Sequence, residues 1–154
     1  NIFALSANQA LWPYAEKRPN VFHRNIVYLT QGQLLIPYGE ASLKERLTAG
    51  ESPGDWDQNV YWDTAGPDAL RFFHRTFQEW QKLGLDRHSR IVDPQFVNAE
   101  QHDFRLKSNS PALELGFQPF DIKNVGLYGE AEWVKEVNHA RCPNIKLPRA
   151  APVH

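Results

Sequence analysis

The chain has 154 residues with 17 basic and 18 acidic side chains, a formal net charge of -1 with neutral histidines. This length suits one domain of roughly 100–200 residues, and the 42% hydrophobic content is enough for a packed core. The balanced charge argues against a nucleic-acid partner. No apolar run reaches the ~18–20 residues that a membrane span needs. The single cysteine, Cys142, excludes an internal disulfide framework.

The chain contains no methionine, and its first residues lack the basic and apolar regions of a signal peptide. We therefore expect a fragment, or the mature remainder, of a longer protein. A processed small protein is the alternative.

Three short segments share one pattern, an asparagine followed by β-branched and aromatic residues, at residues 1–4, 25–28 and 59–62. Such runs favour β-strands. Because the pattern recurs along the chain, we expect one strand per turn of a solenoid, with loops of variable length between the strands. Each asparagine is expected to hydrogen-bond its equivalent on the next turn. The three strands should be parallel and aligned at Ile2, Ile26 and Val60.

Two helices are predicted in the long connections. Ser42 and Glu45 have the spacing of a capping box and Gly50 suits a helix end, which predicts a short helix at about 43–49. Proline and aspartate at 67–68 mark a second start. An apolar stripe at helical spacing then predicts a helix over 68–83 that caps the end of the strands. Its members are Leu70, Phe73, Phe77 and Trp80.

The remaining chain alternates strand-like runs with breaks. Residues 89–92, 95–97 and 103–106 have strand character, and 112–116 continue the series after Pro111. A short C-terminal helix is expected between 129 and 137, and an extended tail over 136–154.

An ordered set of motifs occupies residues 79–126: E-W, G-x-D-x-H-S, D-P-x-F, D-F-x-L, S-P-A and G-F, followed by Val125-Gly126. This set resembles the C-terminal end of bacterial right-handed parallel β-helix proteins, and residues 127–133 resemble their final segment. Many of those proteins are polysaccharide-degrading glycoside hydrolases, with α-L-fucosidase and xylanase members among them. The resemblance implies an all-β fold, a right-handed parallel β-helix, with its last coils and cap over 1–135. A typical member is several times longer, which puts catalysis by this chain alone in question.

The resemblance implies a secreted or periplasmic bacterial enzyme that hydrolyses glycosidic bonds. That reaction uses two carboxyl groups, one protonated and one ionised. The sequence offers Asp57, Asp63 and Asp86 as catalytic candidates, because acidic residues at strand ends can border a groove. Substrate binding is assigned to Trp56 or Trp62, which could stack on a sugar ring, and to His88.

Asp57, Asp86 and His88 have structural alternatives. Asp57, like Asp55, could make local turn bonds. Asp86 and His88 could belong to a turn, and with Ser89 they do not predict a catalytic triad, since neighbours on an extended chain face different sides. We expect no metal and no cofactor, because the histidines are scattered, although calcium is left open.

The expected partners are a polysaccharide or oligosaccharide and, at the open end of the strands, either a missing N-terminal part or another chain. The alternative function is a non-catalytic segment that binds glycan or assembles with another chain. Exposed aromatic side chains on loops, such as Trp12, Trp56 and Trp62, fit both functions. The predicted helix at 68–83 argues against a small β-sandwich lectin.

Overall fold

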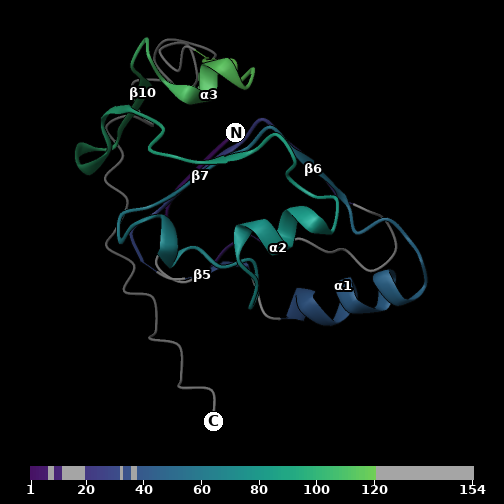
Figure 1. Ribbon diagram of the computed structural model, residues 1–154. Helices are drawn as coiled ribbons and strands as arrows, with labels where there is room; N and C mark the ends of the chain where they lie inside the picture. Colours follow the sequence, from purple (N-terminus) through teal and green to yellow (C-terminus); the bar gives the residue numbers. More distant parts are fainter. Residues whose placement is uncertain (7–8, 12–19, 32, 36–37, 121–154) are drawn as a thin grey trace, which may run out of the picture. The chain divides into compact units, whose positions relative to one another are not determined.

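The computed structural model describes residues 1–6, 9–11, 20–31, 33–35 and 38–120 (Figure 1). The chain divides into two compact units, Asn1–Pro119 and Phe120–His154. Every element below belongs to the first unit. The predicted boundary at residue 135, the C-terminal helix and tail, Trp12 and Cys142 lie outside the described residues.

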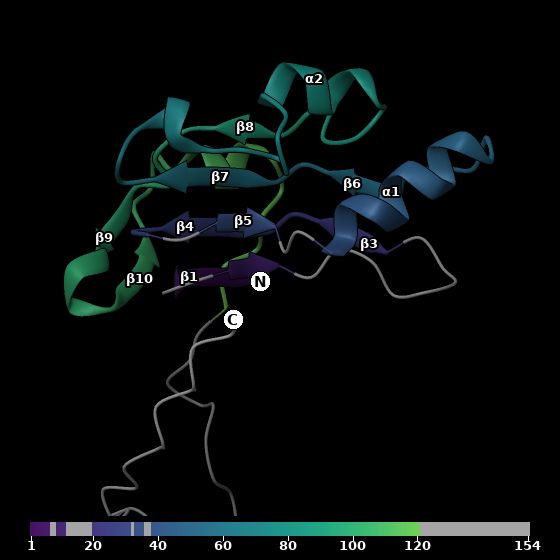
Figure 2. The same cartoon turned by 90° about the horizontal axis from the view of Figure 1, so that it is seen from below.

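A four-stranded parallel sheet forms the centre of the first unit, in the order β1-β4-β7-β8 (Figure 2). Ile2 pairs with Ile26, and Ile26 pairs with Val60. The prediction of parallel, aligned strands at the three asparagine segments is therefore confirmed. The strands are β1 (Ile2–Ser6), β4 (Ile26–Leu29), β7 (Val60–Asp63) and β8 (Arg90–Ile91).

Three smaller sheets accompany it in the described part of the chain. Two are parallel pairs, β2 with β5 and β3 with β6, and one is an antiparallel pair, β9 with β10. The bounds are β2 (Gln9–Leu11), β3 (Val21–His23), β5 (Gln33–Leu35), β6 (Asp55–Asp57), β9 (Phe96–Asn98) and β10 (Asp103–Leu106). A 3₁₀ turn, η2 (Ala99–Gln101), joins the last two.

The asparagines that precede the central strands form a ladder. Nδ2 of Asn1 donates to Oδ1 of Asn25 at 3.0 Å, and Nδ2 of Asn25 donates to Oδ1 of Asn59 at 3.2 Å. Asn25 and Asn59 are buried. The ladder continues to Ser89, whose Oγ accepts from the backbone N–H of Asn59 at 2.8 Å. The expected asparagine contacts are confirmed, and because these buried amides need partners they help to fix the strand register.

Helix α1 (Tyr38–Thr48) begins earlier than predicted, so Ser42 lies inside it and does not cap it. Its end is as expected. Gly50 has a φ of 70°, its N–H donates to the Leu47 carbonyl, and the Glu51 N–H donates to the Arg46 carbonyl at 2.9 Å. This pair of bonds is a Schellman motif, which satisfies the last carbonyls of the helix.

The predicted continuous helix over 68–83 is wrong. The segment contains a 3₁₀ helix, η1 (Pro67–Ala69), and a separate short helix, α2 (Phe77–Lys82). Between them Phe72 bridges to Arg75. Helix α2 starts at a capping box in which Thr76 accepts from the Glu79 N–H while the Glu79 side chain accepts from the Thr76 N–H. This local start signal competes with the longer helix and ends any continuity before Thr76.

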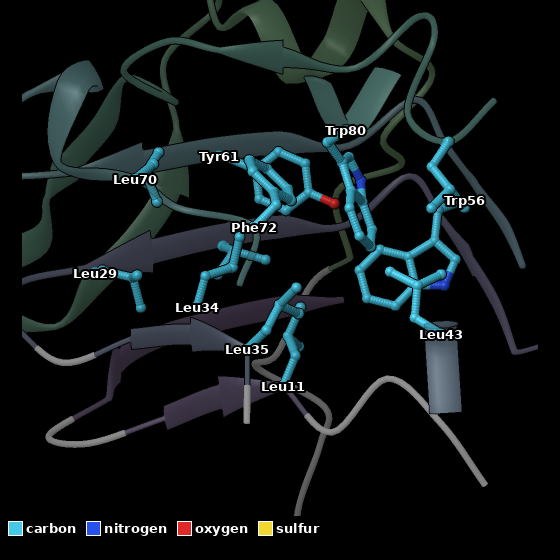
Figure 3. Packing of buried hydrophobic residues seen from close by; sticks show 12 residues of the cluster. Leu11, Leu29, Leu34, Leu35, Leu43, Trp56, Tyr61, Leu70, Phe72 and Trp80 are labelled. Carbon is cyan, nitrogen blue, oxygen red and sulfur yellow. The ribbon is translucent and has the colours of Figure 1, made fainter. Parts of the chain in front are cut away.

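The aromatic residues of this segment nevertheless face the core. Phe73 and Phe77 pack against it, and Trp80 is completely buried. Phe72, outside the predicted stripe, is also fully buried, with its ring 5.2 Å from Tyr61 and 5.3 Å from Trp80 (Figure 3).

The all-β fold class, a right-handed parallel β-helix, is also wrong. The architecture is mixed, with short strands in small parallel and antiparallel sheets plus helices. The physical reason is that the connections fold as helices that carry core residues: Leu43 of α1, Trp80 of α2 and Ala112 of α3 (Pro111–Glu114) are all buried. Residues 112–116, expected to be strand-like, begin in α3 because Ser110 caps that helix.

Candidate functional site

The three predicted catalytic aspartates lie around strand β7. Asp57 ends the preceding strand β6, and Asp63 is the last residue of β7. Asp86 lies close to Asp57, because its backbone N–H donates to the carbonyl of the adjacent Trp56 at 2.7 Å. The structure thus places Asp57 and Asp86 near one end of β7 and Asp63 at the other.

Asp86 is an internal anchor. Its side chain is fully buried and accepts hydrogen bonds from Asn59 Nδ2, Tyr61 OH, Trp80 Nε1 and Ser89 Oγ at 2.6–3.1 Å. Burial raises the pKa of Asp86, and the hydrogen bonds oppose that effect. With its oxygens held by protein donors, the carboxylate is positioned to hold the ladder and α2 together.

Asp57 forms a surface pair with His88. Its Oδ1 accepts from the His88 backbone N–H at 2.7 Å, and its Oδ2 lies 2.6 Å from His88 Nδ1. Partial burial acts to raise the pKa of Asp57, but the hydrogen bonds from His88 outweigh it and hold that pKa below its ordinary value. The His88 side chain is 73% exposed, so this pair is accessible to a ligand.

A second pair of the same kind lies on the neighbouring strand. His23 Nε2 is 2.7 Å from Asp55 Oδ1, and His23 is in register with Asp57. Alternate residues of a strand share a face, so Asp55 and Asp57 lie on the same side of β6. Within the described ranges, no group of three or more histidine, cysteine or acidic residues is placed to hold a metal ion.

Asp63 lies at a different place, in the wall of a cavity of about 360 Å³. The residue is 6% exposed, and its Oδ1 accepts from the Ala65 N–H at 2.8 Å. Among the described residues, Oδ2 has no hydrogen-bond partner. The apolar part of the wall is formed by Leu29, Leu34, Leu35, Leu70 and Phe73.

A second carboxylate, Glu40 at the start of α1, lines the same cavity. Its oxygens contact Arg75 Nη1 at 3.1 Å and His74 Nε2 at 3.3 Å, and Lys44 Nζ lies 3.6 Å away. Slight burial acts to raise the pKa of Glu40, but the Arg75 hydrogen bond and the surrounding positive charge hold it below its ordinary value. Glu40 is therefore an ionised carboxylate at neutral pH.

The sequence did not single out Glu40 as a site residue. It precedes the predicted start of the first helix and is 23 residues from Asp63 in the chain, so no motif joins them. The one available signal was an acidic residue followed four positions later by Lys44, which is typical of any exposed helix.

The two tryptophans assigned to sugar binding differ in exposure. Trp56 is 4% exposed, and its ring lies 4.7 Å from that of Phe22. It also packs against Trp80, with the ring centres 5.9 Å apart, so it is part of the core; Figure 3 shows the two tryptophans. Trp62 is half-buried, next to Asp63 in β7. Because successive strand residues point to opposite faces, Trp62 and Asp63 do not share a side of the sheet.

No protein-family description, curated protein or solved structure matches this chain. In the part of the chain that the structure describes, none of the helices combines the length and the apolar character needed to cross a bilayer.

Proposed function

We propose that the chain is part of a secreted or periplasmic carbohydrate-active protein that binds one sugar unit of a polysaccharide or oligosaccharide in the Asp63 cavity and hydrolyses its glycosidic bond. One observation carries this proposal: two carboxylates, Asp63 and Glu40, line a single cavity together with the ring of Phe73. Paired carboxyl groups are the chemical requirement of glycoside hydrolysis.

The cavity suits a sugar in size and character. Its volume of about 360 Å³ falls within the usual range for small-molecule sites, roughly 300–1,000 Å³. A pyranose presents apolar C–H faces and a rim of hydroxyl groups. The leucines and Phe73 would contact the faces, and Gln33, Glu40 and Asp63 would bond the hydroxyls.

The two carboxylates have different surroundings, which suggests different roles. Glu40 is kept ionised by Arg75 and its neighbours, so we assign it to the carboxylate that stabilises positive charge at the anomeric carbon or activates water. Asp63 has one oxygen with no hydrogen-bond partner in the described part of the chain, so we assign this oxygen to the contact with the leaving oxygen of the glycosidic bond.

The test is reducing-sugar release from a panel of plant and algal polysaccharides by the full-length protein. Glu40→Gln and Asp63→Asn should each lower turnover by about 100-fold or more. The matched control is Glu45→Gln, an exposed carboxylate on the same helix, which should change turnover less than about twofold. Unchanged turnover in both cavity variants, with the fold intact by circular dichroism, would exclude this site.

Two variants at the other location make the result specific. If Asp57→Asn or His88→Ala abolishes hydrolysis and Glu40→Gln does not, the reaction takes place at the Asp57–His88 pair. If the protein binds glycan without releasing product, the second candidate, a non-catalytic glycan-binding or assembly segment, is correct. The His88 side chain is exposed, so a ligand can reach the Asp57–His88 pair, and this pair is therefore tested beside the cavity.

A further inference from the structure

The first strand of each parallel sheet has one edge with no strand beside it in the described chain. Strand β1 pairs only with β4, β2 only with β5 and β3 only with β6. In the central sheet, β1 and β8 are the two outer strands, so the open edge of β1 faces away from β8. Figure 2 shows β1 as the outermost strand of the central sheet. An unpaired edge presents N–H and C=O groups that can bind another strand.

The asparagine ladder has a direction, and this direction defines what can be added to it. At each step the earlier residue donates and the later one accepts: the nitrogens of Asn25 donate to Oδ1 of Asn59 at 2.9 and 3.2 Å. The nitrogens of Asn1 donate in the same way to Asn25. In the described residues, Oδ1 of Asn1 accepts from no donor, so the ladder ends on an open acceptor.

The backbone next to the asparagine ladder has a hydrogen-bond donor that faces the open edge of β1. The Ile26 N–H donates to the carbonyl of Asn1 at 2.9 Å, and the Val60 N–H donates to the carbonyl of Asn25 at 2.9 Å. The equivalent group of β1 is the Ile2 N–H. Since Ile2 is in register with Ile26, its N–H is directed away from β4, toward the open edge.

Apolar side chains also lie near the open edge of β1. The rings of Phe3 and Phe22 are 5.7 Å apart, and the Phe22 ring in turn packs against the buried Trp56. Phe3 and Phe22 themselves are only half-buried. The edge therefore combines backbone groups with apolar surface that a further layer would bury.

We propose that this edge binds an extended polypeptide segment that lies parallel to β1 and carries an asparagine beside Asn1. The carbonyl of that asparagine would accept from the Ile2 N–H, and its backbone N–H and Nδ2 would donate to Asn1 Oδ1. Asparagine suits the ladder position better than serine, which has a single side-chain donor, or leucine, which has none. The asparagine is followed by β-branched residues, as in the strands present.

The experiment joins a second copy of residues 25–35 to the start of the full chain through a flexible glycine-serine linker, which raises the local concentration of the segment. The readout is amide hydrogen exchange at Ile2. We expect exchange at least about tenfold slower than in the unextended chain. The matched control is the same extension with alanine at the position copied from Asn25, which should slow exchange less than about twofold.

Three outcomes overturn the proposal. Equal protection by both extensions would show that the edge does not select asparagine. No protection by either would show that it does not accept a strand. Slow exchange at Ile2 in the unextended chain would show that the edge is already covered, by a second copy if the protection rises with protein concentration and by other parts of this chain if it does not.

Discussion

A carboxylate in this protein takes its role from the donors around it. Asp86 is enclosed by four donor side chains, Asp57 shares a surface pair with His88, and Asp63 lines a cavity with one oxygen that has no partner among the described residues. The three residues have the same side chain but differ in burial and hydrogen bonding, so we expect substitution of each to have a different effect.

Asp86→Asn should destabilise the fold strongly. The amide would place an NH₂ group among four donors, which leaves buried donors without acceptors. We expect a loss of about 3 kcal/mol in the free energy of unfolding, measured by urea denaturation. The control is Asp68→Asn in the exposed first turn of η1, which should cost less than about 0.5 kcal/mol. A comparable loss in both variants would contradict the role assigned to Asp86.

Asp57→Asn should give a loss of stability that depends on pH. Because the pKa of Asp57 is lowered in the folded protein, its contribution is present above the unfolded pKa, near ~3.9, and disappears as pH falls through the folded value. The variant should be less stable than the parent by about 1 kcal/mol at pH 6, and the difference should shrink toward pH 3.5. Urea titrations at both pH values test this, and an equal difference at both would contradict it.

At the scale of elements, the sequence predicts what is determined locally. The asparagine segments are predictable as parallel strands because each repeats the same short pattern. Gly50 is predictable as a helix end because glycine readily adopts the positive φ that this position has. The prediction of one helix over 68–83 is wrong because the apolar spacing fits a long helix and equally fits a turn followed by a short helix. The Thr76–Glu79 capping box decides between them.

The candidate site was predictable only in part, for a similar reason. Asp63 could be identified from its place at a strand end. Its neighbour Glu40 is brought to the same cavity by the position of α1, which no local pattern encodes. Trp56 was expected on the surface because it lies in a loop-like run of polar residues. It is buried because it packs between Phe22 and Trp80, which are distant in the sequence.

Gly50→Ala should weaken the end of α1. The position has a φ of 70°, and an added Cβ would meet no atom within 4 Å, so the cost comes from the backbone alone. We expect a loss of about 1 kcal/mol in the free energy of unfolding. Gly50→Asn should cost less, because asparagine tolerates the left-handed conformation better. Equal effects of the two substitutions in urea denaturation would show that this conformation does not determine the cost.

At the scale of the whole molecule, the two hydrophobic clusters found among the described residues lie within the first compact unit. The larger one includes Trp56, Tyr61 and Trp80, and the smaller one joins Ile26 and Val60 to Phe117. Since these residues all precede the division after Pro119, we expect the burial within these clusters to stabilise this unit without residues 120–154.

A chain that ends at Pro119 should therefore fold alone. We expect a single cooperative urea transition and the near-ultraviolet circular dichroism of buried tryptophan. A chain that ends at Asn109 is the matched comparison, because it also lacks Ala112, Leu115 and Phe117, which are buried in the smaller cluster. Losing them should reduce the free energy of unfolding by more than about 4 kcal/mol relative to the longer truncation. If the chain ending at Pro119 is unfolded while the full chain folds, the two units depend on each other, and the clusters of the first are insufficient by themselves.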